Sequence, residues 1–175
     1  MIRKATTVVG ALLLGMAGAG LSHAEVVTKS AGEFSIKLEQ ELAQDSAAVY
    51  RGLASLPAWW NPVHSYSGSA ENLSMELRAG GCFCERWDEA SVEHLRVIYV
   101  VPGREVRLSG GLGPLQSMPV NGLMQWRIVS LGEKSLLTWE YRVWGSNANN
   151  LHVIAEPVNS VLKEQFGALR DYLEG

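Results

Sequence analysis

Apolar and polar residues alternate along several stretches of the chain, which is the period of a half-buried β-strand. In the first stretch, Phe34, Ile36 and Leu38 alternate with polar and charged residues. Glycine, proline and acidic residues separate the stretches and predict tight turns between antiparallel strands. The predicted strands are residues 34–42, 73–77, 82–87, 92–101, 106–108, 122–131 and 136–144.

Two segments carry helical spacing instead. Asp45 is placed to cap a helix over residues 46–56, which Pro57 ends. Apolar residues at i, i+3 and i+4 then predict an amphipathic helix of about five turns over residues 158–173. One early helix, many strands and one long final helix predict an α+β domain whose sheet is covered on one face. A sheet curved around a single helix leaves space between them, where apolar ligands bind.

The N-terminal segment is a short basic start followed by an apolar run, without the alternation of the later stretches. Arg3 and Lys4 precede an apolar run at 8–21, and the small-x-small sequence Ser-His-Ala follows it. This order predicts a secretion signal over residues 1–24 and one exported domain over residues 25–175, periplasmic or secreted. Four glycines interrupt the run, which is shorter than the roughly 20 apolar residues of a membrane span, so we expect no stable membrane insertion after cleavage.

The net charge and the spacing of the histidines limit which kinds of partner and cofactor the sequence predicts. Without the signal, 13 basic and 18 acidic residues remain, a net charge of −5, which argues against nucleic acid or an anionic membrane. His64, His94 and His152 lie in different segments with no cysteine or carboxylate at metal-ligand spacing, so no metal or other cofactor is indicated. His94 and His152 resemble surface or loop residues.

Cys82 and Cys84 are the only cysteines, and an exported protein meets an oxidising compartment. On a regular strand their side chains share a face about 6–7 Å apart, at the limit for a disulfide. A local disulfide needs a bulge, which Gly80 and Gly81 could permit. The alternatives are two small apolar strand residues, or thiols that act in catalysis or metal binding.

The polar residues give two weak candidates for chemistry. Glu85 is either a buried acid with a raised pKa or the partner of Arg107 or Arg96 across the sheet. His64 follows the Trp59-Trp60 turn and could lie at a cavity mouth. The sequence contains no recognisable Ser-His-Asp order, Cys-His pair or matched pair of carboxylates.

The chain also carries six tryptophans. Most of these large rings are expected in the core, yet some could form the apolar wall of a cavity. The parity of each strand and the inner stripe of the last helix predict six ligand contacts, namely Trp60, Met75, Tyr99, Trp126, Tyr141 and Phe166.

Several local motifs occur in an order that resembles the SRPBCC superfamily, which groups START-like lipid-binding domains, polyketide cyclases and activators of heat-shock ATPases. The resemblance covers most of residues 34–174 and implies a helix-grip fold, a curved seven-stranded antiparallel sheet wrapped around the C-terminal helix with a cavity between them. The motifs are the helix ending at Leu56 with Trp59-Trp60-Asn61-Pro62, Gly80-Gly81 with Glu85, residues 100–103 leading into 106–108, the loop 110–115, and the helix 158–173.

The fold alone does not select a function. We expect an exported, non-catalytic binder of a hydrophobic or aromatic small molecule, because the sequence shows no set of polar residues that would meet at one catalytic site. The alternative is a cyclase-like enzyme in which Glu85 moves a proton on a bound ring. Residues 110–119 predict a lid over the cavity or, alternatively, a surface that docks another exported protein.

Overall fold

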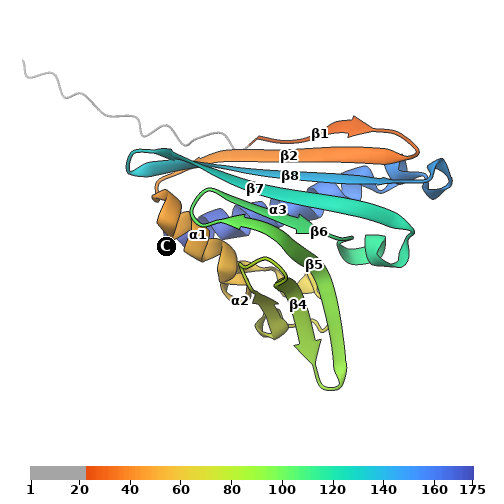
Figure 1. Ribbon diagram of the computed structural model, residues 1–175, viewed down its shortest axis with the longest axis horizontal. Coiled ribbons are helices and arrows are strands. Elements are labelled where there is room, and N and C mark those ends of the chain that lie inside the picture. The colour runs from red at the N-terminus through yellow and green to blue at the C-terminus, as the bar shows by residue number, and fades with distance from the viewer. Residues whose placement is uncertain (1–22) are drawn as a thin grey trace, which may run out of the picture.

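The computed structural model describes residues 23–175, and its main feature is an antiparallel sheet that curves around one long helix (Figure 1). The sheet has eight strands in the order β1-β2-β8-β7-β6-β5-β4-β3. The predicted α+β, helix-grip architecture is confirmed. The strands are β1 (His23–Lys29), β2 (Glu33–Leu42), β3 (Leu73–Met75), β4 (Cys82–Trp87), β5 (Ala90–Val101), β6 (Glu105–Ser109), β7 (Val120–Leu131) and β8 (Lys134–Gly145).

The eighth strand is β1, which the alternation did not predict. It pairs antiparallel with β2 at the sheet edge, where few of its side chains are covered and apolar and polar positions need not alternate. The secretion signal predicted over residues 1–24 lies outside the described residues, apart from His23 and Ala24 at the start of β1.

Three α-helices and five short 3-10 helices complete the part of the chain that the structure describes. Asp45 caps α1 as predicted, because its carboxylate accepts a hydrogen bond from Ala48 N at 2.7 Å. Pro57 does not end this helix; it lies in the first turn of α2, where a missing N–H costs nothing. The helices are α1 (Ser46–Ala54), α2 (Leu56–Trp59), α3 (Ala155–Glu174), η1 (Pro62–His64), η2 (Ala70–Asn72), η3 (Gly113–Ser117), η4 (Asn147–Asn149) and η5 (Leu151–Val153).

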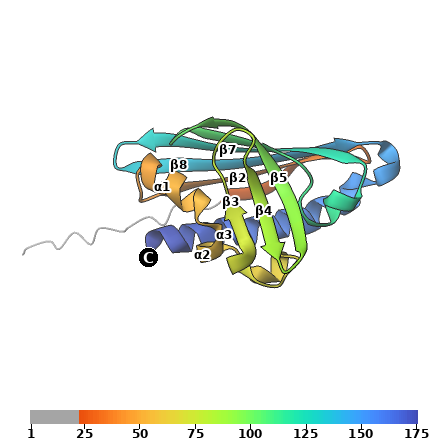
Figure 2. The same cartoon turned by 60° about the horizontal axis from the view of Figure 1, so that its bottom comes forward.

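The long helix α3 runs along the concave side of the sheet (Figure 2). Its buried stripe includes Val158, Leu162, Phe166 and Leu169, at the spacing predicted from the sequence. Among the helices of the described chain, none combines the length and apolarity needed to cross a bilayer.

Aromatic rings fill the space between the middle of α3 and the sheet. The ring of Trp139 stacks on Trp126 with centroids 5.3 Å apart, and contacts Phe166 at 5.1 Å and Trp59 at 6.1 Å. All four side chains are buried. Because protein interiors are close-packed, this cluster fills the middle of the layer, and a cavity lies beyond it beside the N-terminal half of α3.

Candidate functional site

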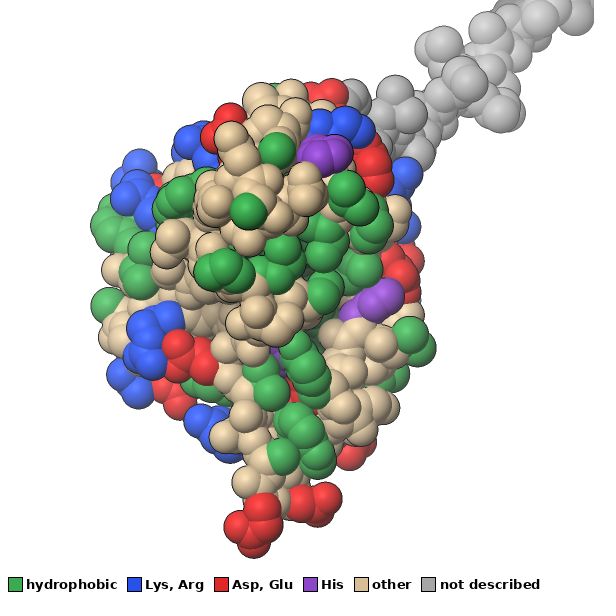
Figure 3. Space-filling model, turned by 90° about the vertical axis from the view of Figure 1, so that its right-hand side faces the viewer, with side chains coloured by type: hydrophobic (Ala, Val, Ile, Leu, Met, Phe, Trp, Pro, Cys, Tyr) green, Lys and Arg blue, Asp and Glu red, His purple; other side chains and the backbone are tan. Residues whose placement is uncertain are grey.

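A cavity of about 440 Å³ opens beyond the aromatic cluster, between α3, η1 and the loop that enters η3. Apolar side chains gather around a hollow on this side of the molecule (Figure 3). The first half of α3 forms one wall, and the segment from η1 to Tyr66 forms the other. Residues that line the cavity include Trp60, Tyr66, His94, Leu112, Pro114 and Leu162.

Glu85 of β4 lies behind this wall and is completely buried. Its two carboxylate oxygens accept hydrogen bonds from Tyr66 N at 3.0 Å and Ser67 N at 2.5 Å, and one of them pairs with His94 Nε2 at 3.0 Å. Burial raises the pKa of Glu85, but the hydrogen bonds from Ser67, Tyr66 and His94 outweigh it, so the pKa is lowered. Glu85 is therefore ionised at neutral pH.

Glu85 is buried, as the first expectation stated, but its pKa is not raised and it pairs with neither arginine. Its pKa is lowered rather than raised, because main-chain N–H groups stabilise the anion. Neither arginine reaches it: Arg107 pairs with Glu105 at 2.6 Å, and Arg96 pairs with Glu93 at 2.5 Å, on the exposed side of the sheet.

His94 of β5 was expected at the surface but is 5% exposed and lines the cavity. The register explains why: Phe83 pairs with Leu95 and Cys84 with Glu93, so His94 is the extra residue of a β-bulge. A bulge lets two consecutive side chains turn to the same face, and His94 and Leu95 are both buried. Burial lowers the pKa of His94 more than Glu85 raises it, so the imidazole is neutral at neutral pH.

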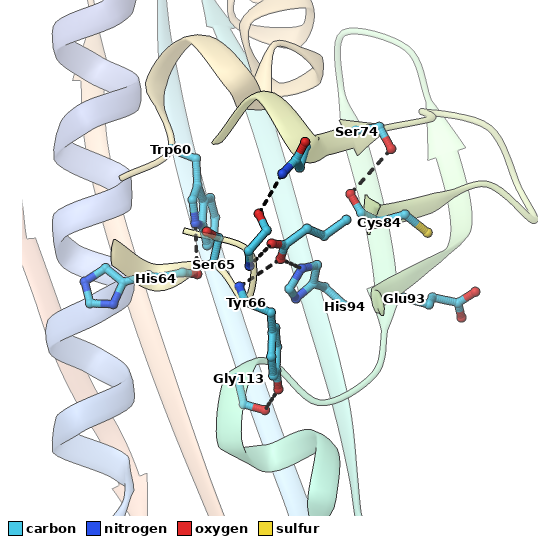
Figure 4. A network of polar contacts seen from close by, with 12 residues as sticks. Trp60, His64, Ser65, Tyr66, Ser74, Cys84, Glu93, His94 and Gly113 are labelled. Carbon is cyan, nitrogen blue, oxygen red and sulfur yellow. Dashed lines mark hydrogen bonds and ion pairs between the residues drawn. The ribbon is translucent and has the colours of Figure 1, made fainter. Parts of the chain in front are cut away.

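Three further contacts lie at the rim of the cavity. Tyr66 donates a hydrogen bond from its hydroxyl to Gly113 O at 3.0 Å, which joins the segment after η1 to η3 (Figure 4). His64, which also lines the cavity, pairs through Nε2 with Glu164 of α3 at 3.0 Å. Asn61 donates to the same carboxylate, and these hydrogen bonds lower the pKa of Glu164.

Of the six predicted ligand contacts, Trp60 lines the cavity and the other five lie elsewhere. Trp126 and Phe166 belong to the aromatic cluster described above. Tyr141 is buried, donates its hydroxyl hydrogen to Gly110 O and accepts a bond from Leu112 N. Met75 is half-buried at the short strand β3.

Tyr99 lies on the outer surface, where the guanidinium of Arg107 packs over its ring at 4.4 Å from the centroid. A second register shift on β5, between Val97 and Tyr99, makes Ile98 the extra residue and turns Tyr99 outward. The two bulges of β5 therefore break the parity from which its inward residues were predicted.

Cys82 and Cys84 form a disulfide, and their Cα atoms lie 5.4 Å apart. The sequence left the state of the two cysteines open, and the structure contains the disulfide. The bond spans Phe83, at the register shift between β4 and β5 that brings His94 inward. Within the described residues, no group of three or more histidine, cysteine or acidic side chains is arranged to hold a metal ion.

Comparison with known proteins supports the fold through structures alone. No family model and no curated protein matches the chain. The crystal structure of CalU16 from Micromonospora echinospora is similar, with a TM-score of 0.58 and 17% identity over 90% of this chain and 85% of that one. MLL2253 from Mesorhizobium loti has a TM-score of 0.57 and 12% identity, over 80% of this chain and 96% of that one. The Aha1 dimer from Colwellia psychrerythraea has a TM-score of 0.56 and 15% identity, over the same shares of the two chains. At these identities the similarity shows the fold alone, a curved antiparallel sheet around a long C-terminal helix.

Proposed function

We propose that this protein is an exported binder of an apolar or aromatic small molecule, which occupies the cavity between α3, η1 and η3. One observation carries the proposal: the cavity holds about 440 Å³ behind a predominantly apolar wall. Ligand sites typically measure about 300–1,000 Å³, are mostly apolar and contain few polar groups. A molecule of two or three fused rings is within this size.

Two features support the export part of the proposal. The first 24 residues have the order of a secretion signal. The disulfide between Cys82 and Cys84 is a bond that persists in oxidising compartments. We expect the protein from its own cells to carry no thiol that reacts with a membrane-impermeant maleimide until a reductant is added. Free thiols in the untreated protein would contradict export into an oxidising compartment.

Ligand binding is tested with the dye N-phenylnaphthylamine, whose fluorescence rises in apolar surroundings. Val161 lines the cavity from α3, and Val161→Trp would fill part of it. Val153 is 69% exposed and lies outside the cavity, so Val153→Trp adds the same ring without occupying the site. We expect Val161→Trp to weaken dye binding about 10-fold or more and Val153→Trp to change it less than about 2-fold. Equal affinities for all three proteins would refute the assignment of this cavity.

Native mass spectrometry of protein purified from its own compartment complements the dye assay. A retained molecule would add mass and identify the ligand class, and Val161→Trp should reduce its occupancy. The absence of added mass, together with no dye binding, would count against a carrier.

A cyclase-like enzyme is the second candidate, and the His94–Glu85 pair at the cavity wall favours it. Glu85 itself is fully buried with both oxygens hydrogen-bonded, so His94 rather than Glu85 would receive a proton from a bound ring. A carrier returns a bound ring compound unchanged. An enzyme converts it, and Glu85→Gln would then lose turnover.

A further inference from the structure

We infer that Nδ1 of His94 accepts a hydrogen bond from the ligand, so that the cavity selects an apolar ring carrying a hydroxyl group, a phenol or an enol, over the matching ether or hydrocarbon. This inference rests on the proposed function and deepens it. The contact is with a buried polar side chain of the cavity wall, and a hydroxyl is the ligand group that satisfies it.

The tautomer of His94 follows from its partner. An ionised carboxylate has no hydrogen to donate, so the 3.0 Å contact between His94 Nε2 and Glu85 Oε2 requires the hydrogen on Nε2. Glu85 is held as an anion by the N–H groups of Tyr66 and Ser67, which come from a separate segment of the chain. In a neutral imidazole with hydrogen on Nε2, Nδ1 carries only a lone pair and is an acceptor.

This lone pair is available to a ligand. Across the described residues, no protein group bonds to Nδ1 of His94. A fully buried atom without a partner would be an orphan, yet Nδ1 is not one of the orphaned buried atoms of this structure, so it reaches open space. The open space that His94 borders is the cavity. In Figure 4 the ring of His94 lies beside Tyr66.

The imidazole is also held in one orientation. Its ring packs on Phe83 with centroids 4.6 Å apart and on Tyr66 at 5.8 Å, and the bulge directs it inward. A positioned acceptor binds a ligand hydroxyl without the cost of ordering a flexible side chain.

The other polar side chains of the wall each make a hydrogen bond within the protein. Ser65 donates its hydroxyl hydrogen to Pro62 O at 2.7 Å, and Tyr66 donates to Gly113 O. His64 pairs with Glu164 at the rim, where its side chain is 27% exposed and water competes for its other nitrogen. The side chain of His94 is 5% exposed, so a hydrogen bond there is shielded from water.

A hydrogen-bond acceptor that faces an apolar cavity distinguishes ligands that can donate a hydrogen from ligands that cannot. A hydroxyl satisfies it, whereas an ether or carboxylate oxygen would place a second lone pair against it. Sites built to hydrogen-bond a hydroxyl reject analogues that lack it, because the buried protein group is then left unpaired.

The test compares β-naphthol with its methyl ether, two probes that share one ring system. Calorimetry gives the affinity ratio of the two probes for the wild-type protein, for His94→Phe, and for the exposed control His152→Phe. We expect the wild type and His152→Phe to prefer β-naphthol about 3- to 10-fold more than His94→Phe does. An equal ratio in all three proteins would overturn the inference and leave the proposed function standing. Failure of both probes to bind the wild type would overturn both.

A measurement on the wild-type protein tests the inference even if the His94→Phe variant does not fold. In ¹⁵N spectra of the histidine rings, we expect His94 to show hydrogen on Nε2 and a bare Nδ1, and β-naphthol to shift the Nδ1 resonance. A protonated Nδ1 in the free protein, or no shift on saturation with β-naphthol, would overturn the inference without any substitution.

Discussion

Replacing Glu85 by glutamine tests the centre of the site with almost no change in volume. The wild-type carboxylate accepts three hydrogen bonds, two from main-chain N–H groups and one from His94. Glutamine has one acceptor oxygen and one NH₂ group, so at least one of the three donors faces another donor. Hydrogen bonds to charged groups contribute about 1.5–3 kcal/mol, and a buried donor without an acceptor costs about 1–3 kcal/mol. We therefore expect Glu85→Gln to lower the free energy of unfolding by about 2–4 kcal/mol.

Urea unfolding at pH 7, followed by tryptophan fluorescence, measures this loss. Glu93→Gln is the matched control, because Glu93 lies on the neighbouring strand and forms an ion pair with Arg96 in which the side chains are 42% and 53% exposed. Exposed pairs contribute about 0–1 kcal/mol, so the control should change little. If the two variants lost the same small amount, Glu85 would not be held as a buried anion and the account of the site would fail.

The pair of Glu85 and His94 predicts how acid affects the stability of the protein. The folded-state pKa of Glu85 is lowered, so its contribution is complete above the ordinary value of 4.5 and is lost as the pH falls through the folded-state pKa. The pKa of His94 is also lowered, so the unfolded chain takes up a proton first and stability falls as the pH drops below 6.5. Wild-type stability should therefore decline from about pH 6.5 downward, and the difference from Glu85→Gln should shrink below pH 4.5. A constant difference from pH 7 to pH 3 would contradict this assignment.

Two other predictions follow from the packing. Tyr66→Phe removes the hydrogen bond to Gly113 O that joins the two sides of the rim. Stopped-flow displacement of N-phenylnaphthylamine should therefore be about 2- to 10-fold faster. An unchanged rate would mean that this contact does not control ligand exchange. Gly122→Ala would place a Cβ atom against Gly110 O and should cost about 2–4 kcal/mol in urea unfolding, whereas Gly167→Ala, with no atom within 4 Å of the added methyl group, should gain about 0.5–1 kcal/mol. Equal effects of the two glycine substitutions would contradict the close approach at residue 122.

The regular elements could be predicted because their signals are local. In β2, every second residue from Phe34 to Leu42 is buried, and a period of two needs no knowledge of the partner strand. The stripe of α3 is likewise a property of one segment. Gly132 is one of the glycines that separate the predicted strands, and it takes a φ of +79° in the turn between β7 and β8.

The candidate site could not be predicted in the same way. His94 and Tyr99 both lie on β5, and one extra residue at each of two register shifts reverses which face they occupy. Plain alternation places Tyr99 inside. No residue within β5 marks the shifts, because register is decided by pairing with β4 and β6.

The types of most elements, the α+β order and the long covering helix could be deduced from the sequence, because hydrophobic periodicity acts over one or two turns or strands. The position of the cavity and the residues that reach it depend on how distant segments pack together. Rings from α2, β7, β8 and α3 meet and fill the centre of the layer, so the open space moves to its end. The partner of Glu85 was decided in the same way, since the N–H groups and the imidazole that hold its charge come from segments that only folding brings together.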